Sequence, residues 1–172
     1  GPRTKQEVRN FTWQMAKELE KMNVKMLVIA CNTATAVALE SLQKYMPFPV
    51  LGVMNAGARA AVKQTKRSEI AVLATEGTIK SGAYETALLS LNTQAKIIPL
   101  ACPTFVPLVE SGEYEGQFSY DLVEAGLKPL QEKRFDTVIL GCTHYPILQK
   151  QIEAAVGPDV HVLSSAEETA KD

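Results

Sequence analysis

Residues 135–152, FDTVILGCTHYPILQKQI, contain an unbroken apolar run, then a small residue, a cysteine and a segment with helical spacing. Residues 25–42, KMLVIACNTATAVALESL, follow the same order with a second cysteine. Short apolar runs without alternation are typical of strands in parallel sheets, because helices cover both faces of such sheets. The two stretches therefore predict strands at 136–141 and 25–30, each ending at a cysteine that precedes a helix.

The rest of the chain continues this alternation of strands and helices. We expect helices over 4–22, 34–45, 56–65, 79–91, 120–131 and 146–155, and strands over 25–30, 49–53, 69–74, 96–101, 136–141 and 160–163. Such an order indicates an α/β fold with mostly parallel sheets. Residues 103–120 lack a clear period and are expected to form a functional loop or a short-helix connection.

The charge balance and the apolar content narrow the class of ligand. Lys and Arg total 18 against 19 Asp and Glu, which leaves no single-sign field to attract nucleic acid or an anionic membrane. No apolar run approaches the roughly 20 residues of a membrane span, and the first ten residues lack a signal-peptide pattern. We therefore expect a small-molecule ligand, with neither nucleic acid nor a membrane as partner.

The cysteines point to a reducing compartment rather than to a disulfide framework. There are three, an odd number with wide spacing, and reduced thiols are typical of intracellular proteins. We expect a cytoplasmic protein.

Two of the cysteines occupy positions where α/β proteins bind ligands. Cys31 and Cys142 each follow the carboxyl end of a predicted strand, and ligands of parallel sheets bind beyond those ends. A helix that starts beside a thiol lowers its pKa and favours the thiolate. The alternative is that each is a small buried hydrophobe, which is the interpretation we favour for Cys102, because Pro103 follows it.

The residues after each thiol favour a binding role. Asn32 and Thr33 follow Cys31, and Thr143 and His144 follow Cys142. Their side chains and the backbone N–H groups of a helix start could hold a carboxylate. Helix capping would explain the threonines equally well, whereas His144 could tune the thiol near neutral pH.

Other polar residues are weaker candidates for the same site. Thr75 and Thr78 flank a turn after the strand at 69–74 and could bind a ligand or cap a helix. Glu110 lies in the irregular stretch, where a solvated glutamate is the ordinary interpretation.

A metal site and a hydrolase site are less consistent with these residues. Cys142 and His144 are two apart, with no CxxC pair or second spaced histidine, so we expect no metal. A hydrolase with Cys142 as nucleophile and His144 as base would need two near neighbours on a turn to face each other, which we do not expect.

Five strings extend this pattern along nearly the whole chain: ACNTATA at 30–36, GARAAV at 57–62, GTIKSGAYE at 77–85, FVPLVESG at 105–112 and GCTHYP at 141–146. Together with the 111-residue spacing of the two cysteines, they closely resemble the bacterial glutamate racemases of the aspartate/glutamate racemase superfamily. The resemblance implies an isomerase that interconverts L- and D-glutamate without a cofactor and supplies D-glutamate for peptidoglycan, and hence for cell wall biogenesis and cell shape.

The resemblance also implies roles for the site residues. Cys31 would act on D-glutamate and Cys142 on L-glutamate, each as base or acid on its own face of the α-carbon. Inversion needs two such groups, because a single base returns the proton to the face it came from. The α-amino and carboxylate groups of the substrate would be held by Asn32, Thr33, Thr143 and His144.

Further residues carry over from the same resemblance. His144 and Glu110 would assist the thiols, and Thr75 and Thr78 would contact or shape the site. Gly1 would bind substrate as the end of a Pro-Tyr-Gly turn.

One part of the family pattern has no match here. The Asp-Ser pair that supports one cysteine and the Pro-Tyr of that turn are missing from this sequence. We therefore expect a chain trimmed at its N-terminus and after residues 164–167, and weak activity or none from these 172 residues alone.

By the same resemblance the chain would form two similar α/β lobes related by a pseudo-two-fold axis, with the active site in the cleft between them. Residues 1–54 and 163–172 would form the first lobe, which carries Cys31, and residues 55–162 the second, which carries Cys142. A homodimer is expected.

Three other functions remain open. The chain could be another member of the superfamily, such as an aspartate or hydantoin racemase, or a decarboxylase that retains one cysteine. It could also be a non-catalytic protein that binds an acidic amino acid, or a regulatory protein.

Overall fold

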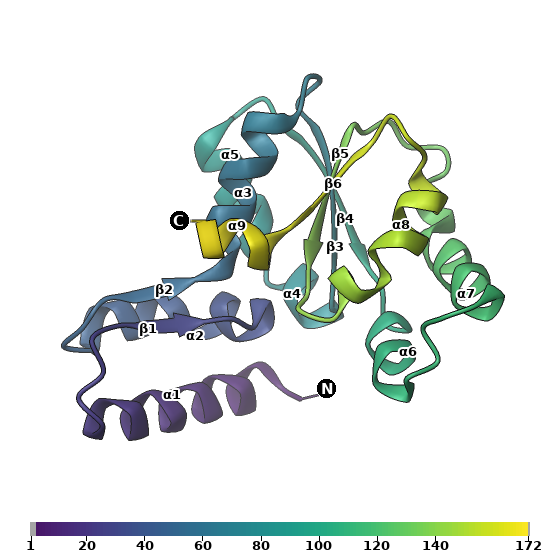
Figure 1. The fold of residues 1–172 in the computed structure, drawn as a ribbon. Helices are drawn as coiled ribbons and strands as arrows, with labels where there is room; N and C mark the ends of the chain where they lie inside the picture. Colours follow the sequence, from purple (N-terminus) through teal and green to yellow (C-terminus); the bar gives the residue numbers. More distant parts are fainter. Residues whose placement is uncertain (1–2, 172) are drawn as a thin grey trace.

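The computed structural model describes residues 3–171 and confirms an α/β fold with parallel sheets (Figure 1). Helices and strands alternate along the chain in this order: α1 Lys5–Lys21, β1 Leu27–Ile29, α2 Asn32–Tyr45, β2 Val50–Gly52, α3 Val53–Gln64, β3 Glu69–Ala74, α4 Glu76–Lys80, α5 Ala83–Leu91, β4 Lys96–Ala101, α6 Phe105–Ser111, α7 Gln117–Leu127, the 3-10 helix η1 Lys128–Leu130, β5 Thr137–Gly141, the 3-10 helix η2 Tyr145–Leu148, α8 Gln149–Val156, β6 His161–Ser164 and α9 Ser165–Lys171.

The strands form two parallel sheets. One has the order β4-β3-β5-β6, and the other pairs β1 with β2. Ala74 at the end of β3 is in register with both Ala101 of β4 and Gly141 of β5. The carboxyl ends of these strands therefore meet at one edge of the larger sheet, where Cys142 follows β5.

Helices cover both faces of the larger sheet (Figure 1), as its uninterrupted apolar strands require. Ile70 and Val72 of β3 pack into one core with residues of α3 and α5. Ala71 and Leu73 alternate to the other face and pack with residues of α6, α7 and α8. This period of two is the ordinary geometry of a strand.

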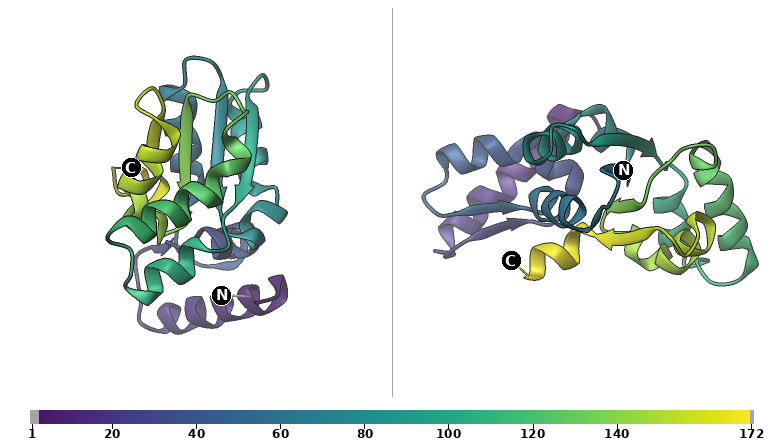
Figure 2. Two further views of the ribbon diagram at one scale, coloured as in Figure 1. Left: turned by 90° about the vertical axis from the view of Figure 1, so that its right-hand side faces the viewer. Right: turned by 90° about the horizontal axis from the view of Figure 1, so that it is seen from above.

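The small sheet has a core of its own beside the larger one (Figure 2). In that core Ala16 of α1 packs together with Ala38 and Leu42 of α2 and with Ile29 and Val50 of the two strands. Helix α2 also contacts α3 and α4, so the segment that starts after Cys31 packs against two helices of the part that contains the larger sheet.

The observed elements differ from the predicted ones at several boundaries, and the single helix predicted over 79–91 is interrupted, with α4 ending at Lys80 and α5 beginning at Ala83. Helix α3 begins at Val53, directly after β2, rather than at residue 56. Residues 103–120 are mostly helical, forming α6 and the start of α7, in agreement with the short-helix alternative. The segment after Cys142 begins as a 3-10 helix with Pro146 in its first turn, and α8 starts only at Gln149.

The predicted division into lobes and their pseudo-two-fold relation stay predictions. The predicted boundary between residues 162 and 163 of the two lobes falls inside β6, which pairs with β5 in the larger sheet. Within residues 3–171, none of the helices combines the length and apolar composition that crossing a bilayer requires.

Asp136 connects the turn after α3 to the start of β5. Burial works to raise the pKa of its carboxyl group, but hydrogen bonds from the Thr65 hydroxyl, the Lys66 N–H, the Thr137 hydroxyl and the Arg67 N–H together lower it. The ionised carboxylate is therefore the form that the fold stabilises.

Because folding lowers this pKa, the contribution of Asp136 is present above the unfolded pKa of about 3.9 and is lost as the pH falls through the folded value. We expect Asp136→Asn to lower the free energy of unfolding at pH 7 by about 1–3 kcal/mol, because a neutral amide cannot reproduce the charge-assisted hydrogen bonds of the ionised carboxylate. Urea denaturation of both proteins at pH 7 and pH 3 would check this. A difference that stays equal at both pH values would contradict it.

Candidate active site

The two thiols that follow strand ends have different environments. Cys31 is exposed at the N-cap of α2, without a side-chain capping bond. Cys142 follows β5 and is 8% exposed. Burial raises the pKa of Cys142, and Cys31 is close enough to raise it further by electrostatic repulsion. The fold thus brings the two cysteine segments together although 111 residues separate the thiols in sequence, because Asn32 beside Cys31 is joined through Ser165 to the Leu140 carbonyl near Cys142.

The prediction that a helix start lowers the pKa of Cys142 is wrong. The expected local donors are present, since the backbone N–H groups of His144 and Tyr145 favour the thiolate. Burial outweighs them, and a 3-10 helix rather than an α-helix begins at Tyr145. Cys142 is therefore a protonated thiol at neutral pH.

His144 lies between Cys142 and a carboxylate. Its Nδ1 atom is 3.8 Å from the Cys142 sulfur and 3.5 Å from the Thr143 hydroxyl. Its Nε2 atom is 3.3 Å from Oε1 of Glu110. The expectation that near neighbours on this turn do not face each other is therefore wrong, because the imidazole of His144 at the N-cap of η2 lies beside the sulfur.

Glu110 reaches this group from α6. Its side chain is 66% exposed, whereas that of His144 is 32% exposed, so the pair is open to solvent and contributes orientation more than stability. Glu110 therefore contacts His144, and His144 in turn contacts Cys142. A carboxylate on the far nitrogen of an imidazole can hold the ring in one orientation beside a thiol.

Three threonine hydroxyls, one of them two residues after Cys31, form a cluster. The Thr33 hydroxyl lies 2.9 Å from that of Thr75 and 3.0 Å from that of Thr78, and these two are 3.1 Å apart. Thr75 also caps α4 by accepting the N–H of Thr78. Thr75 therefore both caps α4 and belongs to a cluster in which its hydroxyl and those of Thr33 and Thr78 face one another.

Asn32 is buried and its amide is engaged inside the protein. The Tyr84 hydroxyl donates to its Oδ1 atom at 2.7 Å, and its Nδ2 atom donates to Ser165 Oγ at 3.3 Å. Thr143, by contrast, is exposed beside His144. Substrate binding by either residue stays a prediction.

Two other predictions concern Gly1 and metal binding. Gly1 lies outside the described residues. Among residues 3–171, no three His, Cys, Asp or Glu side chains gather as they would around a metal ion.

Cys102 is the buried hydrophobe that the sequence predicts. It is 1% exposed, and burial raises the pKa of its thiol to about 12.

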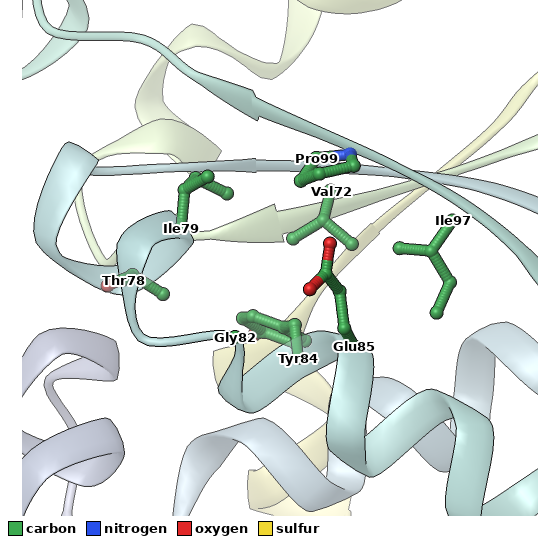
Figure 3. Close-up of a pocket in the computed structure, with 8 residues that line it drawn as sticks. All are labelled: Val72, Thr78, Ile79, Gly82, Tyr84, Glu85, Ile97 and Pro99. Carbon is green, nitrogen blue, oxygen red and sulfur yellow. The ribbon is translucent and has the colours of Figure 1, made fainter.

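A small pocket opens beside the threonine cluster (Figure 3). Apolar side chains of β3 and β4 form one wall, and residues from α4 to α5 form the other; its lining comprises Val72, Thr78, Ile79, Gly82, Tyr84, Glu85, Ile97 and Pro99. Neither Cys31 nor Cys142 borders it, so it is separate from the thiols.

Sequence reasoning missed two residues of the site. Ser165 follows β6, and the rule that ligands bind beyond strand ends could have indicated it. Tyr84 lies in the first turn of α5, where no local pattern distinguishes it from an ordinary core tyrosine.

The environments of the three cysteines predict their order of alkylation. Cys31 should react first with iodoacetamide because it is exposed, and Cys142 more slowly because it is nearly buried. Cys102 should stay unmodified between pH 6 and pH 9, because its raised pKa leaves almost no thiolate. Peptide mass spectrometry after timed labelling would measure the order, with the urea-unfolded chain as control. Labelling of Cys102 as fast as Cys31 would contradict this assignment.

Comparison with known proteins is consistent with this arrangement. The chain is 83% identical over 172 residues to glutamate racemase of Lysinibacillus sphaericus, in an alignment that covers all of this chain and 65% of that protein. This chain therefore spans only about 65% of the length of such curated relatives.

Solved structures match the fold closely. Glutamate racemase of Bacillus anthracis superposes with a TM-score of 0.96 at 45% identity, over 99% of this chain and 64% of that one. Glutamate racemase of Francisella tularensis, solved in complex with D-glutamate, gives 0.91 at 29% identity, over 99% of this chain and 63% of that one. The sequence profile of Asp/Glu/hydantoin racemases matches residues 1–172. Because the profile matches the whole of this chain, the chain belongs to the Asp/Glu/hydantoin racemase family.

Proposed function

We propose that this chain carries the two-thiol centre of a glutamate racemase, which interconverts L- and D-glutamate without a cofactor. The observation that carries the proposal is the hydrogen-bonded link between the segments of Cys31 and Cys142, which follow the ends of strands in two different sheets: Asn32, next to Cys31, bonds to Ser165, and Ser165 bonds to the Leu140 carbonyl, two residues before Cys142. A substrate between two thiols presents opposite faces of its α-carbon to them. That is the arrangement inversion needs.

The proposed reaction is a proton transfer in each direction. In the direction from D- to L-glutamate, the Cys31 thiolate takes the α-proton, so an S–H bond forms while the Cα–H bond breaks. The electron pair is shared with the substrate carboxylate. Cys142 then gives its proton to the opposite face and becomes a thiolate, ready for the reverse reaction.

The protonation state of Cys142 fits its role in that direction. Burial raises its pKa, so it begins as the acid that the second half of the reaction requires. His144 lies beside its sulfur, and Glu110 holds the far side of the imidazole. We assign this pair the role of steadying the thiol as its charge changes.

The polar groups around the thiols suit a dicarboxylate amino acid. The hydroxyls of Thr33, Thr75 and Thr78 face one another, and the exposed Thr143 lies beside His144. Hydroxyl donors bind carboxylates well. Glutamate is favoured over aspartate and hydantoins because a relative 83% identical to this chain is a glutamate racemase and one related structure contains D-glutamate.

The setting of the activity is part of the same proposal. D-glutamate made by the protein would supply peptidoglycan synthesis, so a cytoplasmic location is assigned with it. A homodimer is proposed on the same family grounds.

Hydrogen exchange at the α-carbon tests this function. The chain is incubated with L- or D-glutamate in D₂O, while circular dichroism follows inversion and mass spectrometry follows deuterium uptake. Because both thiols are present in this chain, the proposal commits to weak activity rather than none. We expect both signals from either enantiomer, weaker than those of glutamate racemase of Lysinibacillus sphaericus assayed in parallel, and none from aspartate. No exchange and no inversion would overturn the proposal, and equal turnover of aspartate would move the chain to the aspartate racemases.

A further inference from the structure

One buried chain of hydrogen bonds runs between the two thiol-bearing turns. The Tyr84 hydroxyl donates to Asn32 Oδ1, Asn32 Nδ2 donates to Ser165 Oγ, and Ser165 Oγ donates to the Leu140 carbonyl at 3.2 Å. Asn32 and Tyr84 are each 3% exposed and Ser165 is 1% exposed. Asn32 follows Cys31 directly, and Leu140 is two residues before Cys142.

The direction of these bonds is determined by their ends. The Leu140 carbonyl can only accept, so Ser165 must donate to it and must accept from the Asn32 amide nitrogen. Asn32 then presents its oxygen to Tyr84, whose hydroxyl must donate. Burial raises the pKa of the Tyr84 hydroxyl, a hydrogen bond with Ser165 lowers it and Cys142 raises it, and the balance is a raised pKa, so the tyrosine keeps its proton at neutral pH.

The ring of Tyr84 touches the second thiol-bearing turn. A Cβ atom added to Gly141, which precedes Cys142, would lie 2.9 Å from Tyr84 Cε2. The ring therefore packs against the bare backbone of Gly141, while its hydroxyl holds Asn32. Tyr84 enters from the first turn of α5, beside the pocket of Figure 3, and belongs to neither cysteine segment.

We propose that Tyr84 is a positioning residue that fixes the separation of the two thiols, with its ring against Gly141 on the Cys142 side and its hydroxyl on Asn32 on the Cys31 side. This role rests on the proposed racemase function. A two-base inversion depends on the placement of both thiols relative to one α-carbon. Misplacement of about 1 Å by a residue outside the chemistry can lower a rate about 100-fold.

Tyr84→Phe separates the two contacts. It keeps the ring on Gly141 but removes the hydroxyl, so Asn32 Oδ1 loses its buried donor. We expect kcat for glutamate racemisation to fall about 10- to 100-fold in both directions, with KM changed by less than about 3-fold. Tyr84 is itself nearly buried, so its hydroxyl is not expected to contact substrate, and the expected loss is in the alignment of Cys31 with Cys142.

The matched control is Thr137→Val at the opposite end of β5. Thr137 is 0% exposed and its hydroxyl bonds to Asp136, so this variant also loses one buried hydroxyl but stays far from the strand end that carries Cys142. A purely structural role for Tyr84 predicts equal effects of the two variants on kcat. The positioning role predicts normal kcat for Thr137→Val at a comparable loss of stability.

Hydrogen exchange measured by mass spectrometry gives a second readout that needs no turnover. In Tyr84→Phe we expect backbone amides of residues 31–35 and 140–143 to exchange at least about 10-fold faster together, whereas Thr137→Val should leave residues 31–35 unchanged. Faster exchange confined to α5 would overturn the proposal, as would parent-like kcat in an active Tyr84→Phe variant. A parent chain without racemisation would overturn the proposed function instead, and the exchange data would then decide the positioning role alone.

Discussion

Cys142→Ser is expected to lower kcat for glutamate racemisation at least about 1000-fold, and Cys31→Ser to do the same. General acid–base groups contribute about 100- to 10,000-fold, and a serine hydroxyl is neither a base nor a useful acid near neutral pH. Because inversion requires a proton taken from one face and a proton given to the other, neither thiol can replace its partner. Circular dichroism with each enantiomer as substrate measures the loss.

Deuterium uptake would show which face each thiol serves. With Cys31 replaced, the remaining Cys142 should still exchange the α-hydrogen of L-glutamate slowly without inverting it, and Cys142→Ser should do so with D-glutamate. Cys102→Ala is the control, because Cys102 is buried away from solvent in the apolar core, and its kcat should stay within about 3-fold of the parent. A non-catalytic binding protein would keep its glutamate affinity in all three variants and show no turnover in the parent.

Phe105→Ala is expected to have the largest effect on stability, lowering the free energy of unfolding by about 3–5 kcal/mol. Phe105 is 0% exposed and lies edge-on to Tyr145, with ring centroids 5.3 Å apart. A Cβ on Gly126 would lie 2.7 Å from its ring, so the ring fills its site closely and its removal leaves a cavity in apolar surroundings. The loss corresponds to a fall in melting temperature of about 10 °C.

The variant should also disturb the site, because Phe105 begins the helix that carries Glu110. Phe118→Ala is the matched control, since Phe118 is 59% exposed on α7 and should change stability by less than about 0.5 kcal/mol. Guanidinium denaturation of the three proteins measures the difference. Equal losses for both variants would show that the core between α6 and η2 is not packed as described.

The α/β architecture could be predicted because its signals are local. Unbroken apolar runs such as EIAVLA at 69–74 and TVILG at 137–141 favour buried parallel strands whatever surrounds them. The rule for strand ends likewise located Cys31 and Cys142 before any contact was known. Element boundaries were less certain, as at Val53, because propensity changes gradually along a chain whereas a helix begins at a defined residue.

The local patterns by themselves determined the order of strands and helices, the parallel sheets and the placement of two thiols at strand ends. Only the tertiary structure decided the chemistry around those thiols. The pKa of Cys142 is raised by burial that its own neighbours do not reveal, and His144 meets Glu110 across 34 residues of sequence. Tyr84 reaches Asn32 across 52 residues. Backbone propensity acts over a few residues, whereas burial and hydrogen-bond partners arise from whichever segments the packed core brings together.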